Sequence, residues 1–172
     1  MAKLFTIRVT LNPPNPAEVF GKNADAYMKG AEIVFRTSVF KFLELLIRFG
    51  RRKTGRLVSG FTPMMDAHNY NYLRSWQHSD EESAQAVMEG KAAGTFDESN
   101  PWDLIIVNAV EYAGYVEEKV GVTEKGQLPI LIPYFEKFMV ENFDAFMQNA
   151  AKGGFETKNF GLIEDFGPPE VS

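Results

Sequence analysis

The two histidines, His68 and His78, are the side chains in this sequence that could shuttle protons near neutral pH. Their spacing fits no metal-ligand pattern, and the residues around them are polar and rich in aromatic side chains. Such surroundings are typical of histidines in surface loops rather than of catalytic or metal-binding ones. The absence of cysteine excludes disulfides, thiolate metal ligands and a cysteine nucleophile.

Acidic side chains and short motifs offer no better candidates for chemistry. On a helix Glu111 and Glu118 would share one face while Glu117 points elsewhere, and nothing makes two carboxylates converge on one bond, as paired-acid catalysis requires. Ser59 lacks the glycine two residues before it that a nucleophile elbow needs. The second glycine of residues 90–94 is not followed by the lysine and serine of a P-loop. We therefore expect a protein without enzymatic activity, cofactor or bound metal.

Three aromatic residues, Tyr70, Tyr72 and Trp76, could form a stacking platform for sugars or bases. The spacing of the two tyrosines is also typical of one face of a strand, where aromatic side chains pack against a core or an edge. We favour packing. A soluble, non-enzymatic carbohydrate- or peptide-binding module is the alternative function that these residues leave open.

Length and charge set limits on the class of protein. A chain of 172 residues with 45% apolar residues predicts one soluble globular domain. Acidic residues outnumber basic ones 23 to 18, so we expect no tightly held nucleic acid. No stretch approaches the ~18–20 apolar residues of a membrane-spanning helix, and no secretory signal is visible, so no membrane partner is expected.

A strand and a long helix are the clearest elements in the first third of the chain. Apolar and polar residues alternate over residues 5–11, which predicts a half-buried strand. Residues 16–49 then predict one helix of roughly 50 Å at ~1.5 Å per residue, ended by Gly50. Its main apolar stripe is Phe20, Ala24, Tyr27, Ala31, Phe35, Phe42 and Phe49, with Met28, Val39 and Leu46 beside it.

A second apolar stripe, Ile33, Phe40 and Ile47, is spaced by seven on the other side of this helix. A helix that is apolar on two sides must be buried on both. The second cover is either another helix of the same chain or a neighbouring subunit. Because a chain of this size has few elements to spare, we treat the second stripe as a candidate subunit interface.

The sequence predicts short secondary-structure elements in the middle of the chain. Residues 54–61 predict a turn and a short apolar stretch that joins a sheet, and residues 62–78 an irregular excursion or a hairpin. A capping box at Ser79 predicts a helix to about Met88, followed by a loop over residues 94–101.

The apolar run 104–107 predicts a central strand. Pro129 and Pro133 bracket a predicted extended segment, after which a helix carries Phe135, Phe138, Met139, Phe143 and Phe146. We therefore expect an α+β domain over residues 1–152, with a small antiparallel or mixed sheet packed on a long N-terminal helix and a C-terminal helix. Residues 62–100 are its irregular excursion, and residues 153–172 form an extended tail.

Three segments, taken in order, resemble the head–tail joining or tail-completion proteins of long-tailed bacteriophages. The first, residues 54–59, lies behind the long helix, the second begins at Asn108, and the third, residues 128–133, leads into the last helix. Their motif residues are Thr54, Gly55, Leu57, Tyr112, Ala113, Tyr115, Glu117, Pro129 and Pro133. The resemblance covers roughly residues 16–150 and depends on the order of the three motif segments.

The resemblance implies a structural protein of the virion neck, made in the host bacterial cytoplasm. It would form a homo-oligomeric ring of six or twelve copies, as a tail terminator, stopper or connector. Its other partners would be an adjacent neck or stopper protein and the tail tube protein, with DNA passing non-specifically through the lumen. An acidic chain suits a lumen through which DNA slides.

The tail adds three candidate interface residues, Phe155, Phe160 and Phe166, which lie five and six residues apart among glycines. No core periodicity explains this spacing. We therefore expect another subunit to bury them, together with the second stripe of the long helix.

Overall fold

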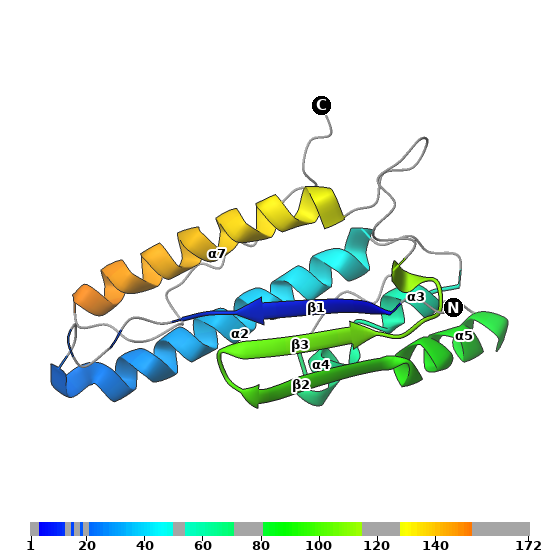
Figure 1. Cartoon of the computed structure of the whole chain (residues 1–172), viewed down its shortest axis with the longest axis horizontal. Coiled ribbons are helices and arrows are strands. Elements are labelled where there is room, and N and C mark those ends of the chain that lie inside the picture. Colours follow the sequence, from blue (N-terminus) through cyan, green and yellow to red (C-terminus); the bar gives the residue numbers. More distant parts are fainter. Residues whose placement is uncertain are drawn as a thin grey trace.

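The computed structural model describes residues 4–12, 15, 18, 21–49, 54–70, 81–114 and 128–152, with the backbone alone for residues 48–49 and 128–135. These residues form an α+β fold in which a three-stranded sheet lies against a long helix (Figure 1). In chain order the elements are β1 (Phe5–Thr10), η1 (Gly21–Asn23), α2 (Ala24–Phe49), α3 (Arg56–Ser59), α4 (Pro63–Ala67), α5 (Glu81–Ala92), β2 (Gly94–Asn100), β3 (Asp103–Asn108) and α7 (Leu128–Ala151).

The sheet is antiparallel with strand order β1-β3-β2, so the predicted central strand is confirmed as β3. The alternation in residues 5–11 is confirmed as β1, which places Phe5 and Ile7 in the core. In the register of the sheet Ile106 lies opposite Ile7 on one side and Phe96 on the other. The apolar run of β3 therefore supplies the middle of the sheet.

The loop expected over residues 94–101 is wrong, because Gly94–Asn100 forms the edge strand β2. Its residues are mostly polar, and Phe96 packs against the core while Asp97 and Ser99 are exposed. A polar strand with one open face is well suited to a sheet edge. Because β2 is so polar, it shows no alternation of apolar and polar residues from which a strand could be predicted.

The long helix α2 begins at Ala24, later than expected. Gly21 has a φ of 51°, a left-handed conformation that a continuous helix does not contain, and the 3-10 turn η1 precedes Ala24. The main stripe is confirmed where the structure describes it: Tyr27, Phe35 and Phe42 are buried. The sheet covers this helix, with Phe35 and Trp102 ring centroids 6.1 Å apart.

The C-terminal helix α7 starts at Leu128, so the extended segment expected between Pro129 and Pro133 is wrong. Pro129 falls in the first turn, where a backbone N–H has no partner within the helix, and Pro133 removes a single helical hydrogen bond. α7 packs on α2, with the rings of Tyr27 and Phe146 stacked at 5.5 Å. The cover of this part of α2 is thus a helix of the same chain (Figure 1).

The segment between α2 and β2 is more regular than expected. Residues 54–61 do not join the sheet but form α3, and Pro63–Ala67 forms α4 within the excursion expected at 62–100. Backbone hydrogen bonds between residues close in sequence stabilise these turns and short helices. One of them runs from the Ser59 N–H to the Gly55 carbonyl oxygen over 3.0 Å. The predicted helix near residues 79–88 is confirmed by α5, which continues to Ala92.

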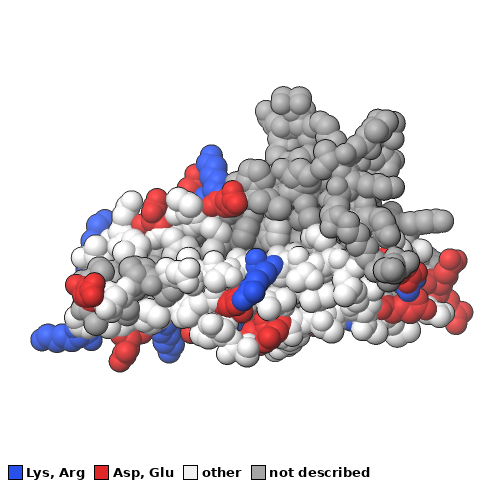
Figure 2. All heavy atoms as spheres, viewed as in Figure 1, with Lys and Arg blue, Asp and Glu red and all other residues white. Residues whose placement is uncertain are grey.

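Charge is unevenly placed on the face that presents β1. Figure 2 shows acidic side chains gathered at the α5 end, while the middle of this face is mainly uncharged. Among the described residues, no helix is long and apolar enough to cross a membrane.

Candidate functional site

The first two motif segments meet at the end of the sheet where β3 stops. Gly55, with a left-handed φ of 85°, turns the chain so that α3 begins at once. The buried side chain of Asn108, the last residue of β3, donates from Nδ2 to the Leu57 carbonyl oxygen over 2.8 Å. Its Oδ1 accepts a hydrogen bond from the Val110 N–H at 3.2 Å. One amide therefore joins α3 to the strand and to the turn that follows it.

Two glycines allow the elements of this corner to approach closely. A Cβ on Gly60 would lie 2.6 Å from Cγ of Asn108. A Cβ on Gly90, in α5, would lie 2.9 Å from the carbonyl carbon of Arg56 and closer still to its oxygen, although real Cβ contacts are essentially never under 3.0 Å. α5 therefore crosses α3 in backbone contact. The sequence predicts the end of this helix near Met88, before Gly90, so it gives no signal for this contact.

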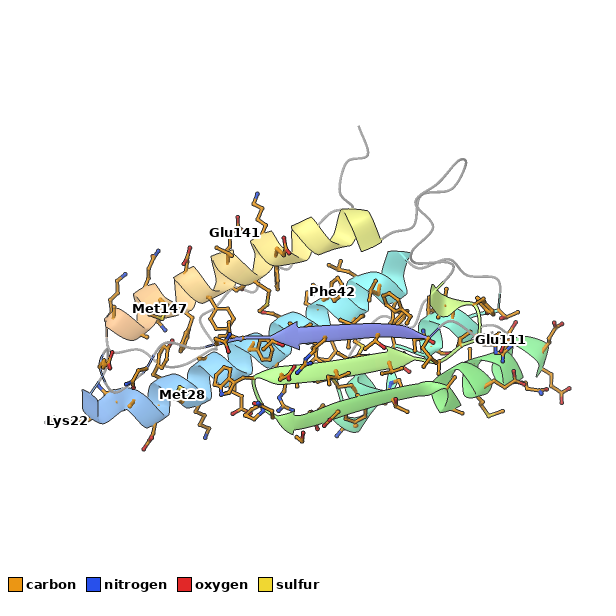
Figure 3. All side chains as sticks on the ribbon, viewed as in Figure 1. Lys22, Met28, Phe42, Glu111, Glu141 and Met147 are labelled. Atoms are coloured by element: carbon orange, nitrogen blue, oxygen red, sulfur yellow. The ribbon has the colours of Figure 1, made fainter. Side chains whose placement is uncertain are left out.

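Arg56 forms the polar surface of the same corner. Its Nη2 lies 3.2 Å from Oε2 of Glu111, and its Nε lies 3.4 Å from Oε2 of Glu89 (Figure 3 labels Glu111). A hollow of about 340 Å³ adjoins it, lined also by Thr54 and Tyr112. Because two carboxylates share one guanidinium, this hollow has no excess positive charge with which to hold a phosphate.

The other motif residues fall in different places. Leu57 and Ala113 are buried beneath the corner, and Tyr112 is 36% exposed beside the hollow. Pro129 and Pro133 belong to the backbone of α7. Tyr115, Glu117 and Glu118 lie outside the described residues.

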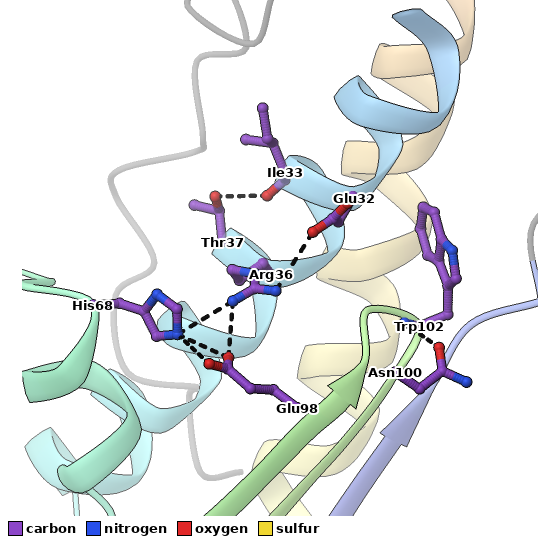
Figure 4. A network of polar contacts seen from close by, with 8 residues as sticks. All are labelled: Glu32, Ile33, Arg36, Thr37, His68, Glu98, Asn100 and Trp102. Carbon is purple, nitrogen blue, oxygen red and sulfur yellow. Dashed lines mark hydrogen bonds and ion pairs between the residues drawn. The ribbon is translucent and has the colours of Figure 1, made fainter. Parts of the chain in front are cut away.

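His68 belongs to a polar network that joins α2 to the sheet (Figure 4). Its Nε2 lies 2.7 Å from Oε2 of Glu98 in β2, and Nη1 of Arg36 in α2 lies 2.8 Å from the same oxygen. Glu32 lies 3.4 Å from Arg36 one helical turn away. An arginine between two carboxylates and an imidazole is a structural ion-pair arrangement, and we assign these side chains to packing. His78 lies outside the described residues.

No group of three or more acidic, histidine or cysteine side chains in the described part of the chain is close enough to hold a metal ion. The described polar clusters consist of ion pairs or of an arginine guanidinium shared between carboxylates. These arrangements join elements of the fold to one another.

Two residues of the second stripe are not available to another subunit, so this part of the candidate interface is corrected. Phe40 is 6% exposed and Ile47 is buried in the same core. The rings of His68 and Tyr70 cover Phe40, with centroids 5.6 and 4.9 Å away. Ile33 is 42% exposed and remains a candidate interface residue. The tail residues Phe155, Phe160 and Phe166 lie outside the described residues.

Tyr70 is used for packing rather than for stacking on a ligand. Its ring is half-buried against Phe40, and its hydroxyl lies 3.5 Å from Oε2 of Glu44. Burial, followed by the charge of Glu44, raises the pKa of Tyr70 to about 12. Tyr72 and Trp76, the other members of the proposed platform, lie outside the described residues.

Comparison with protein-family models, with curated proteins and with solved structures gives no match to this chain. The functional argument therefore depends on the geometry of the fold and on the motif segments themselves.

Proposed function

We propose that this protein is a non-enzymatic structural component of a tailed-bacteriophage neck, where its copies form a ring that completes the tail and joins it to the head. The observation that carries the proposal is the corner at Asn108. There the side chain of one motif segment binds the backbone of another that lies 51 residues earlier in the chain. Two separate pieces of the resemblance are therefore parts of one structural unit.

The architecture is consistent with this role. The resemblance implies a small sheet packed on a long helix, and β1, β3 and β2 lie on α2 in this way. The polar clusters at Arg56 and Arg36 join elements of the fold and present no catalytic constellation. The carbohydrate-binding alternative is less favoured because the ring of Tyr70 is engaged by Phe40.

The ring would act as a passive conduit and adaptor. It would contact a neck or stopper protein on one side and the tail tube protein on the other, within the virion. A net charge of −5 per copy favours a lumen that repels DNA, so that DNA would pass without being held. A ring structure with a lumen lined by Lys and Arg would contradict this part of the proposal.

The mass of the assembled protein tests the proposal most directly. Light scattering and native mass spectrometry, followed by electron microscopy, are expected to show closed rings, either alone or after mixing with heads or tails. The partners must be included because some rings assemble only on them. A protein that stays monomeric at high concentration and attaches to neither heads nor tails would refute the proposed function.

A pair of charge substitutions on α2 tests the remaining stripe residue. Ile33→Asp places a carboxylate at a 42% exposed apolar position, and is expected to leave the fold intact while weakening assembly. Ala26→Asp adds the same charge at an exposed position of the same helix and serves as the matched control. Equal assembly of both variants would remove Ile33 from the interface.

A further inference from the structure

Among the described residues, the sheet has a free edge at β1. The strand order β1-β3-β2 gives β1 a hydrogen-bonded neighbour on one side alone within the described residues. The Leu11 N–H donates to the Trp102 carbonyl oxygen at 2.9 Å, and this pair continues the register in which Val9 lies opposite Leu104. Because antiparallel ladders alternate, the backbone groups of Val9, Ile7 and Phe5 point toward β3.

The intervening residues Thr6, Arg8 and Thr10 therefore direct their backbone N–H and C=O groups away from the sheet. This row of donors and acceptors is the template that an added strand requires.

A groove runs along this edge between β1 and α7. It has a volume of about 590 Å³ and is lined by residues 5–11, by Phe42 of α2 and by Glu136, Met139 and Val140 of α7. Phe42, labelled in Figure 3, is buried and gives the groove an apolar wall from α2. Val140 of α7, which is 60% exposed, adds an accessible apolar side chain to the wall that α7 provides.

We propose that this groove receives the C-terminal segment, residues 153–172, of a neighbouring copy, which adds a strand to the free edge of β1. The inference rests on the proposed function, since it names the contact by which the ring closes. The tail and the groove are different surfaces of one chain, so a tail placed in the next copy's groove is a heterologous contact. Repeated around a rotation axis, such a contact produces a closed ring.

The tail has the length and the side chains for this role. The 20 residues after Lys152 span up to ~66 Å when extended, against the ~20 Å of a six-residue strand. Phe160 and Leu162 are two residues apart, so in a strand both point to one face and could enter an apolar groove together. Gly161 between them has no side chain to obstruct the opposite face.

The direction of α7 favours a neighbouring copy over the same copy. Val140 is the last residue of α7 in the groove, and the helix continues to Ala151. Eleven further residues carry the start of the tail about 16 Å past that point at ~1.5 Å per residue. The tail therefore starts beyond the groove of its own chain and, although long enough to reach it, would have to turn back to enter it.

A matched pair of substitutions at the edge tests the proposal in the full-length chain. Arg8→Pro removes the outward N–H, while the ladder to β3, which uses the neighbouring residues, is retained. Arg8→Ala removes the same side chain and its ion pair with Asp103 but keeps the N–H. We expect rings from Arg8→Ala, and association weakened about a hundredfold for Arg8→Pro and for Phe160→Asp. Circular dichroism and thermal unfolding establish that each variant is folded.

Mixing the two defective variants gives the decisive result. The Arg8→Pro chain has an intact tail and a blocked groove, whereas the Phe160→Asp chain has an intact groove and a defective tail. A single tail-to-groove contact then remains, so native mass spectrometry is expected to show a 1:1 pair that does not grow into rings.

Three results would overturn the inference. The first is normal ring formation by both Arg8→Pro and Phe160→Asp, which would leave the proposed function standing on some other contact. The second is the absence of the 1:1 pair from the mixture. The third is protection of the Thr6, Arg8 and Thr10 amides from hydrogen exchange in a wild-type monomer, because the tail would then occupy its own groove. Failure of the wild-type chain to form rings, both alone and after mixing with heads or tails, would instead refute the proposed function.

Discussion

Replacing Gly90 by alanine is expected to destabilise the protein, although the same change in most helices stabilises it. Alanine is favoured over glycine inside a helix by about 1 kcal/mol. At Gly90, however, the new Cβ would lie 2.9 Å from the carbonyl carbon of Arg56, whereas ordinary contact begins at 3.4 Å. The obstacle is backbone, so α5 and α3 must move apart rather than rotate a side chain.

The magnitude follows from the two opposing effects. Overpacking of this kind costs about 1–3 kcal/mol, and a clash with backbone belongs at the upper end of that range. After the gain in helix propensity we expect a net loss of about 2 kcal/mol in the free energy of unfolding. For a chain of this length that loss corresponds to a fall in Tm of about 4–8 °C.

Urea and thermal unfolding followed by circular dichroism measure the effect. Met88→Ala is the control, since Met88 is 65% exposed in the same helix and its truncation is expected to change stability by less than ~0.5 kcal/mol. A Gly90→Ala protein as stable as wild type, or more stable, would refute the backbone contact between α5 and α3. The corner around Asn108 would then need another explanation.

Three further outcomes are expected. Asn108→Ala should lower the free energy of unfolding by about 2–4 kcal/mol in urea, because two hydrogen bonds are lost and the buried Leu57 carbonyl is left without the amide; a loss under ~1 kcal/mol would contradict this. In an ultraviolet titration Tyr70 should ionise near pH 12, and since its folded pKa is raised, stability should fall as pH rises from ~10 toward 12; Tyr70→Phe should remove one late-ionising tyrosine, while burial still raises the pKa of Tyr27. The hydrogen bond from Arg8 lowers the pKa of Asp103. The stabilisation from the ionised Asp103 should therefore disappear as pH falls below ~4. Asp103→Asn should remove the contribution of the carboxylate. An acid unfolding curve unchanged by this substitution would contradict the prediction.

Elements with a strong apolar period could be predicted from the sequence. β1 and the buried run of β3 were located within a residue or two, and so was the end of α2. The start of α2 differs from the helix predicted over residues 16–49 because Gly21 adopts a left-handed turn, which apolar periodicity does not reveal. Polar β2 was missed because its pairing with β3, not its own side chains, makes it a strand.

The candidate site was predictable only in part, because its contacts join distant residues. Asn108 and residues 54–59 were recognised as motif segments, but their hydrogen bond spans 51 positions and no local pattern encodes it. The ion pair from Arg56 to Glu111 spans 55. Phe40 of the second stripe was misassigned because helical spacing shows that Phe40 needs a cover without showing that Tyr70 supplies it.

The placement of β1 against β3 also has a consequence for synthesis of the chain. Arg8 and Asp103, whose side chains bond across the finished sheet, are 95 residues apart. At ~5–20 residues per second, a ribosome needs roughly 5–20 seconds to make the partner strand. During that time the apolar side of the first strand has nothing to pair with, whereas β2 and β3 are joined by a short turn and can form a hairpin at once. Closing the sheet is therefore a late event in folding, and a nascent chain stalled before Asp103 would leave Phe5, Ile7 and Val9 exposed to chaperones and to aggregation.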